Sequence, residues 1–167
     1  MAAERLITDE ARAMIGVESD PVTGYPVMEH EIRRYAYAVD DLNPLWLDAE
    51  YASKTKWGGI IAPPLCYNMS FATDYPLSEL REDGVPKGGG SRLSPPLRAT
   101  RSLAGGTDVE FFQPVRPGDI LTSKSRLEDI YEREGRSGRL AFTVTSTTYT
   151  NQRGEVVCVV KSTSIAR

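Results

Sequence analysis

The chain has 167 residues, 40% hydrophobic and 26% charged, the composition of a folded soluble protein and not of a disordered one. A net charge of −3 disfavours a nucleic-acid surface, and with one histidine the chain cannot assemble a histidine-cysteine zinc cluster. No apolar run approaches the ~20 residues that span a bilayer, and the N-terminus lacks the apolar core of a secretory signal. We therefore expect one cytoplasmic domain over residues 1–167, without metal, cofactor, nucleic-acid partner or membrane partner.

Helix signals dominate the first half of the chain. Apolar residues recur at helical spacing over Glu29–Val39, which predicts a helix there. The other predicted elements are a helix over Thr8–Ile15 that starts at the capping residue Thr8 and stops before Gly16, a strand over Tyr25–Met28, a polar turn over Asp40–Trp46, and a helix over Asp48–Lys54 capped by Asp48.

The middle of the chain combines an apolar segment with a long loop. A helix over Leu65–Ala72 is predicted to be buried on every side, because it is apolar nearly all round, and Pro64 suits its first position. Residues Thr73–Ala104 are rich in proline, glycine and serine, and loops of this length tend to be functional or mobile. Cys66 and Cys158 are expected to be buried small hydrophobes, not a disulfide or a metal site.

The second half of the chain is predicted to be a meander of strands. Alternation of apolar and polar residues is clearest over Leu140–Thr150. Antiparallel strands with one polar face commonly pack the other face on a helix. The sequence therefore predicts an α+β hot-dog fold, in which a curved antiparallel sheet wraps around a long buried central helix. The strands expected in it are Thr107–Gln113, Ile120–Tyr131, Leu140–Thr150 and Glu155–Ile165.

Three segments carry a family resemblance that extends over most of the chain. The sequence DLNPLW at 41–46 resembles the signature of R-specific enoyl-CoA hydratases and MaoC-like dehydratases, which runs Asp, any residue, Asn, Pro, an aliphatic residue, His. Residues 58–64 resemble the start of the family's central helix, and residues 111–119 its strand-to-turn segment. The chain more closely resembles the N-terminal type of MaoC dehydratase domain, related to the dehydratase region of bacterial type I fatty acid synthases.

The resemblance implies a reaction at an acyl thioester. In the family an Asp and a His hold one water between them for addition to the double bond. Asp41 matches that Asp, and Asn43 supports the loop, but Trp46 stands at the His position. An indole N–H can only donate a hydrogen bond, so Trp46 cannot act as the base. The interpretation of Asp41 stays open between a catalytic carboxylate and a turn cap.

The family's second catalytic element is also altered. Related active domains usually read Ala-His-Gly at the start of the central helix, and their backbone N–H groups stabilise the thioester oxygen. This chain has Pro63 and Pro64 there, and proline has no N–H, so Leu65 offers the first donor. The chain alone is therefore not expected to be a competent hydratase by the family mechanism.

The expected substrate contacts follow from the same resemblance. Arg98 and Arg101, in the long loop, are candidates for the phosphates of coenzyme A, against the simpler interpretation of a solvated loop. His30 is expected on the surface, remote from the Asp41 loop. The residues expected to line the acyl site are Trp46, Pro64, Leu65, Cys66 and Tyr67.

Three functions remain open from the sequence. The first is a subunit of an enoyl-CoA hydratase or 3-hydroxyacyl dehydratase that binds the acyl group of an acyl-CoA or acyl-carrier thioester and pairs with a catalytic Asp/His chain. The second is a homo-oligomeric enzyme that uses Asp41 with another acid such as Tyr67. The third is a non-catalytic acyl-CoA binding protein. Because long strands leave an open sheet edge, we expect a homo- or hetero-dimer or tetramer, with another MaoC-like chain as the candidate partner.

Overall fold

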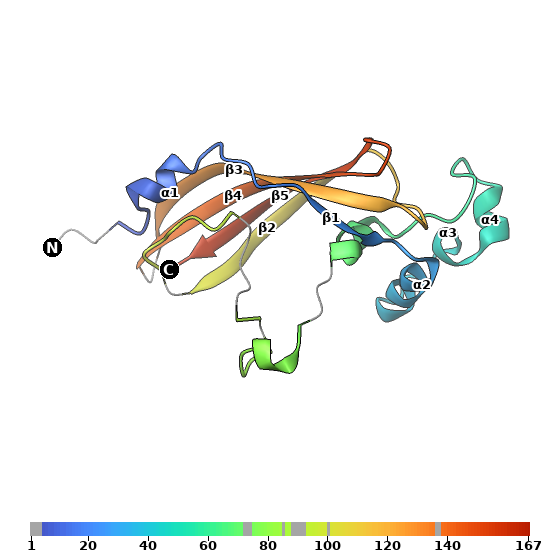
Figure 1. The fold of residues 1–167 in the computed structure, drawn as a ribbon, viewed down its shortest axis with the longest axis horizontal. Coiled ribbons are helices and arrows are strands. Elements are labelled where there is room, and N and C mark those ends of the chain that lie inside the picture. Colours follow the sequence, from blue (N-terminus) through green and yellow to red (C-terminus); the bar gives the residue numbers. More distant parts are fainter. Residues whose placement is uncertain (1–4, 72–74, 85, 88–92, 100, 136–137) are drawn as a thin grey trace.

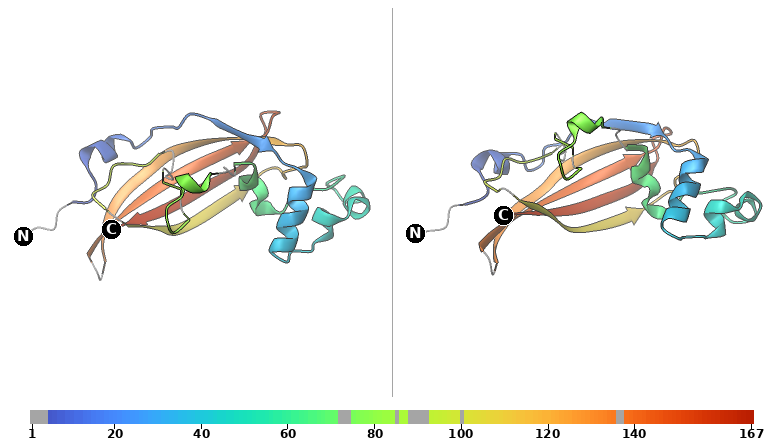
Figure 2. Two further views of the ribbon diagram at one scale, coloured as in Figure 1. Left: turned by 60° about the horizontal axis from the view of Figure 1, so that its bottom comes forward. Right: turned by 90° about the horizontal axis from the view of Figure 1, so that it is seen from below.

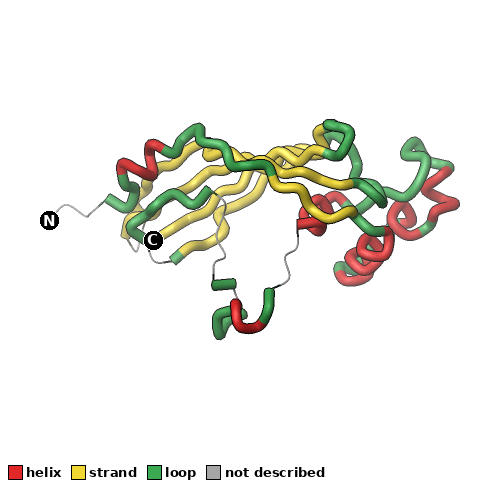
Figure 3. Tube along the Cα trace, viewed as in Figure 1, coloured by secondary structure: helices red, strands yellow, loops and turns green. Residues whose placement is uncertain are grey.

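The computed structural model describes residues 5–71, 75–84, 86–87, 93–99, 101–135 and 138–167. A curved sheet forms the body of the molecule, with helices at both of its ends and one further short helix on a loop beside the sheet (Figure 1, Figure 3). In chain order the elements are α1 (Asp9–Ala13), β1 (Val22–Pro26), α2 (Glu29–Ala38), α3 (Pro44–Leu47), α4 (Ala49–Ser53), the 3-10 helices η1 (Pro64–Phe71) and η2 (Leu77–Glu79), β2 (Ser102–Phe111), β3 (Ile120–Gly135), β4 (Gly138–Thr150) and β5 (Val156–Ala166).

The five strands form one antiparallel sheet in the order β1-β3-β4-β5-β2. The predicted strands are present with other bounds, since β1 is Val22–Pro26 and not Tyr25–Met28, and β2 ends at Phe111 and not at Gln113. The largest difference is at β2, which begins at Ser102, inside the segment predicted as loop. Its first residues pair with the end of β5, from Ser102 opposite Ala166 onward, so tertiary pairing and not local propensity makes them strand.

Local capping signals are confirmed where the sequence placed them. The Thr8 hydroxyl accepts from Ala11 N at 3.0 Å and starts α1, and the Asp48 carboxylate accepts from Glu50 N and Tyr51 N and starts α4. Asn43 caps α3, because its side-chain oxygen accepts from Leu45 N at 3.0 Å. A polar turn was predicted at this place, so the short helix α3 corrects that prediction. Such bonds satisfy N–H groups that have no partner within a helix.

The segment predicted as a long buried helix differs from that prediction. Its described part is η1, a 3-10 helix of eight residues. Cys66, Tyr67 and Ser70 are buried, but Leu65 is 56% exposed. The first turn closes with a bond from Cys66 N to Pro63 O at 2.9 Å, as expected of i→i+3 geometry. The described helix therefore packs one side on the sheet and leaves the other side open.

Two apolar clusters hold the sheet at its opposite ends. The larger joins η1, α2 and α3 to the sheet through fully buried residues such as Ile32, Leu121 and Cys158. The smaller joins Ile7 and Ala11 near α1 to the sheet beside the β3–β4 hairpin. None of the helices in the described ranges is long and apolar enough to cross a membrane.

Gly24 on β1 is required by a close approach to η1. A Cβ at this position would lie 2.5 Å from Ser70 O and 2.8 Å from Ser70 Oγ. We predict that Gly24→Ala lowers the free energy of unfolding by about 1–3 kcal/mol, because backbone must shift to relieve the overlap. Urea denaturation would measure the loss, with Thr23→Ser on the same strand as control. Equal stability of the two variants would contradict the close contact.

Candidate functional site

An apolar cavity of about 290 Å³ lies where the α3 loop, the start of η1 and the end of β2 meet. Its walls are Leu45 and Trp46, residues 61–64, residues 111–115, Trp57 and Val157. Apart from the two indole N–H groups, Gln113 contributes the polar side chain among the described lining residues, and none of those residues is charged. A cavity with this lining suits a hydrocarbon group and not a phosphate or a carboxylate.

A hydrogen bond joins Asp41 and Trp46, the first and last residues of the 41–46 motif. Trp46 Nε1 donates to Asp41 Oδ2 at 3.0 Å, and the Trp46 ring is 7% exposed. The other carboxylate oxygen of Asp41 accepts from Asn43 N at 3.4 Å, and Asn43 in turn caps α3. Both oxygens of the carboxylate therefore serve the loop, and one of them is covered by the indole.

This arrangement removes the usual chemistry from the motif. An Asp and a His could hold a water between them and move its proton. The indole N–H is a donor only and has no lone pair to accept that proton. Asp41 Oδ2 accepts from the indole N–H, so its partner at the His position is a group that cannot take up a proton. Trp46 thus acts as a cavity wall and a loop anchor.

The start of η1 offers little to a thioester oxygen. Pro63 and Pro64 carry no N–H, and Ala62 N is committed to Val115 O at 2.8 Å. Ile61 N donates to Leu45 O at 3.3 Å. The first donor after these is Leu65 N–H, on a residue that does not line the cavity. An oxyanion hole of the family type, which needs N–H groups aimed at one oxygen, is not built by these residues.

The strand-to-turn segment at 111–119 builds the opposite wall. Arg116 Nη2 donates to Trp57 O at 2.8 Å, which fixes the loop that carries the Trp57 ring, and Lys56 Nζ lies 4.5 Å from that ring's centroid. Arg116 N donates to Asp119 Oδ2 at 2.8 Å, and buried Asp119 pairs with Arg153 at 3.3 Å. Trp57 and Arg116 were not predicted as site residues, because only the fold brings them together.

Tyr67 and Cys66 lie behind the cavity and not on its surface. Tyr67 packs against Phe111 and Tyr149, with ring centroids 6.4 and 4.9 Å away. Burial raises the pKa of the Tyr67 hydroxyl and raises the pKa of the Cys66 thiol to about 12. Both groups are therefore neutral at physiological pH, and the thiol is no nucleophile.

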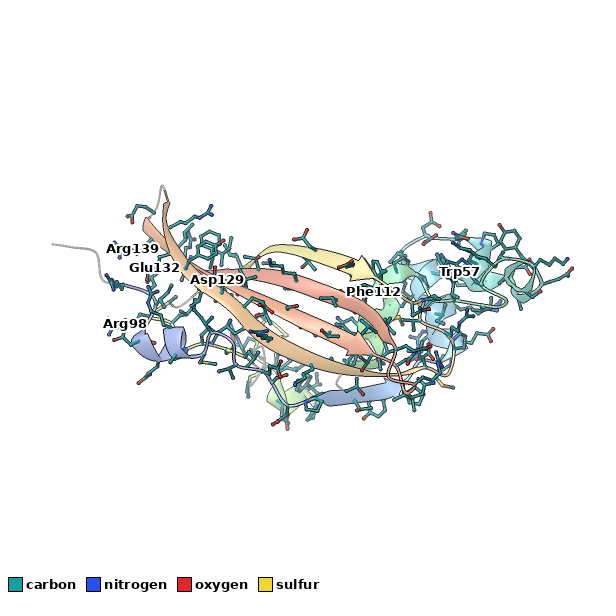
Figure 4. All side chains as sticks on the ribbon, turned by 90° about the horizontal axis from the view of Figure 1, so that it is seen from above. Trp57, Arg98, Phe112, Asp129, Glu132 and Arg139 are labelled. Atoms are coloured by element: carbon teal, nitrogen blue, oxygen red, sulfur yellow. The ribbon has the colours of Figure 1, made fainter. Side chains whose placement is uncertain are left out.

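The predicted basic contacts are not brought to the cavity. Arg98 lies beside Glu132 and Arg139 at one end of the molecule, whereas Trp57 and Phe112 mark the cavity at the other (Figure 4). Arg101 pairs through its backbone with Arg167, the last residue of the chain. Arg98 and Arg101 are therefore separate from the apolar cavity, whose described lining includes neither of them.

Two remaining expectations concern histidine and metal. His30 lies exposed on α2, as predicted. Among the described residues, no three side chains of the metal-binding types gather into a candidate metal site.

Comparisons with known proteins agree with the predicted family and fold. Residues 13–160 match the family described as "FAS1-like, dehydratase domain region". A UPF0336 protein of Saccharopolyspora erythraea is 31% identical over 156 residues, covering 93% of this chain and 90% of the relative. A probable enoyl-CoA hydratase alpha subunit of Thermomonospora curvata is 31% identical over 137 residues, and this chain spans only 42% of its length.

Solved structures show the same fold. The ChsH1-ChsH2 complex from Mycobacterium tuberculosis superposes with a TM-score of 0.73 at 21% identity, covering 94% of this chain and 89% of the matched one. The hot-dog fold predicted from the sequence is thereby confirmed.

The Trp46–Asp41 bond can be tested by removing its donor. Trp46→Phe keeps an aromatic wall but leaves Asp41 Oδ2 without the indole, at a partly buried position. We predict a loss of about 1–3 kcal/mol in the free energy of unfolding, as for other hydrogen bonds to a charged group. Chemical denaturation measures this, and Trp57→Phe is the control, since no side-chain bond of the Trp57 ring nitrogen is seen in the described structure. A loss no greater than that of the control would contradict a bond of this strength.

Proposed function

We propose that this chain, which belongs to the FAS1-like dehydratase family of MaoC-like hot-dog hydratases and dehydratases, is the acyl-binding half of a two-chain enzyme. In this proposal a second MaoC-like chain supplies the catalytic Asp/His pair. The single observation that carries it is the bond from Trp46 Nε1 to Asp41 Oδ2, which takes the place of a base–water pair.

The cavity supports an acyl-binding role. Hydration of an enoyl thioester, or the reverse dehydration, requires the acyl group to be held against a base and an oxyanion donor. The apolar walls at Trp46, Trp57 and Phe111 can hold the hydrocarbon part. The base and the oxyanion donor are the parts that this chain does not assemble at the family's positions. A division of labour between two chains accounts for both observations.

The open edge of the sheet supports pairing with a second chain. β2 is an edge strand, and its burial pattern is exposed at every residue except Val109. Phe111 and Phe112 at its end are 46% and 50% exposed while also lining the cavity. A chain that paired along β2 would cover this edge and lie directly beside the cavity. The names of two similar proteins also support pairing, because one is called an alpha subunit and the other is a complex of two chains.

The alternative that uses Asp41 and Tyr67 within this chain has less support. It needs Asp41 to give up the Trp46 indole, and it needs Tyr67 to reach the substrate from behind the cavity wall. The third function, acyl binding without any turnover, shares the cavity and differs only in lacking a catalytic partner.

Filling the cavity should abolish acyl binding. Ala62 is 5% exposed and lines the cavity, so Ala62→Leu places a larger side chain in the space of the ligand. We predict at least a tenfold rise in the Kd for octanoyl-CoA, measured by calorimetry on the chain with its partner. Ala38→Leu on the exposed face of α2 adds the same atoms elsewhere and should leave the Kd unchanged. Similar Kd values for the two variants would place the acyl group outside this cavity.

Co-expression tests the division of labour directly. The chain should be inactive alone on enoyl-CoA substrates and active when purified with a neighbouring MaoC-like chain. We predict that Asp41→Asn in this chain keeps turnover of the complex within about twofold, because Asn retains an oxygen for the Trp46 indole. Replacing the Asp of the partner's own motif should reduce turnover by at least ~10². If Asp41→Asn abolishes turnover while native mass and circular dichroism are unchanged, the proposal is wrong.

A further inference from the structure

The concave face of the sheet carries a second hollow, separate from the apolar cavity. It has a volume of about 470 Å³, and its described walls come only from β2, β3, β4 and β5. η1 packs on the sheet at one end, and α1 packs at the other near the β3–β4 hairpin (Figure 2). The hollow lies on the stretch of strands between these two covers. We call it the hydroxyl groove, because its central wall is made of serine and threonine.

The strand register shows how the hydroxyls come to share this face. Side chains alternate across a sheet, so residues two apart on one strand point the same way. Thr107 of β2 pairs with Ser162 of β5, and Ser162 pairs with Thr145 of β4. These three residues form one continuous row across three strands. The rows on either side add Ser164 with Thr143, and Thr147 with Ser125.

The described lining of the groove is mainly polar. No aspartate, glutamate, lysine or arginine is among the walls that the structure describes. Ser125 and Thr147 bond each other at 2.8 Å, whereas the hydroxyls of Thr107, Thr145 and Ser162 have no protein partner in the described structure. An unpaired hydroxyl that is covered by an apolar group costs about 1–3 kcal/mol. A hydrocarbon therefore covers this row poorly, and a neutral group with its own oxygen atoms covers it well.

The groove and the apolar cavity lie one after the other along β2. Phe111 lines the cavity, and Val109 and Thr107 follow it on the same face of β2 at two-residue steps. Four residues of strand span about 13 Å. Between the aromatic and the hydroxyl residues on this face lie Val109 and its β5 partner Val160, which line neither hollow. A ligand extended along β2 from the cavity would meet apolar walls first and hydroxyls last.

We propose that the hydroxyl groove binds an uncharged, oxygen-bearing group at the far end of the acyl chain, such as a hydroxyl or a ketone. The inference rests on the proposed function, because it places the hydrocarbon next to the thioester in the Trp46 cavity. It adds the substrate class: acyl thioesters that carry oxygen remote from the reacting carbons, in preference to plain hydrocarbon chains of equal length.

Matched pairs of ligands test this class. Octanoyl-, decanoyl- and dodecanoyl-CoA are compared with the same three thioesters that carry a terminal hydroxyl, by calorimetry on the chain with its partner. At the length that reaches the groove, the hydroxylated member should bind about 3- to 10-fold more tightly, as one or two hydrogen bonds allow. The double variant Thr145→Val, Ser162→Ala removes two hydroxyls with little change of shape and should abolish that preference. Ser146→Ala, on the opposite face of β4, should preserve it.

Each other outcome is informative. Equal binding of the two members at every length, unaffected by the double variant, overturns the inference and leaves the proposed function standing. Failure of all six thioesters to bind overturns the proposed function and the inference with it. The double variant could instead change the native mass of the complex and leave the ligand preference as it was. The groove would then be a subunit contact, and the inference would be wrong.

Discussion

The hydrogen bond from Trp46 Nε1 to Asp41 Oδ2 connects the loop, the cavity and the loss of the family's chemistry. It ties the indole to the residue that begins the 41–46 motif, at 3.0 Å and at a partly buried position. Asn43 bonds to the same carboxylate and starts α3, so the carboxylate, the cap and the ring depend on one another. A side chain that could exchange protons is replaced by one that can only donate. The 41–46 loop therefore keeps its hydrogen bonds, but it has no histidine to act as a base.

The opposite wall of the cavity depends on a second polar anchor. Asp119 is 2% exposed and accepts from Arg116 N, while Arg153 from the β4–β5 turn pairs with it. Arg116 then reaches the carbonyl of Trp57, a contact between residues 59 apart in the chain. A buried carboxylate that lost these partners would be costly, so this turn is held in one geometry. The cavity is thus bounded by two loops that side-chain hydrogen bonds hold.

Local signals were sufficient for part of the fold. Thr8 and Asp48 were predicted as caps, because a side-chain oxygen that accepts from N–H groups two or three residues on needs no tertiary context. The start of β2 was predicted as loop, since Thr73–Ala104 is rich in proline, glycine and serine, yet pairing with β5 makes it strand and leaves a bulge between Ala104 and Gly106. An apolar pattern alone also does not separate an α-helix from the 3-10 helix η1.

The sequence predicted which residues of the site are chemically altered, but not how the walls of the cavity come together. Asp41, Trp46 and Pro64 were identified because the motif fixes their places in the chain, but the direct bond between the first two was not. Trp57 carries no motif, and its position depends on Arg116, a contact that exists only in the folded chain. Arg98 was a candidate by charge and loop position, and the fold places it at the far end of the molecule (Figure 4).

The central claim is that the Trp46 indole N–H is bonded to the Asp41 carboxylate. Hydrogen exchange at the two tryptophan ring nitrogens, followed by nuclear magnetic resonance, tests it most directly. Because the Trp46 N–H is bonded and its ring is buried, we predict that it exchanges at least tenfold more slowly than the N–H of half-buried Trp57. Asp41→Asn, which keeps an acceptor, should retain most of this protection. Equal and fast exchange at both rings would show that Asp41 is free, and would contradict the account.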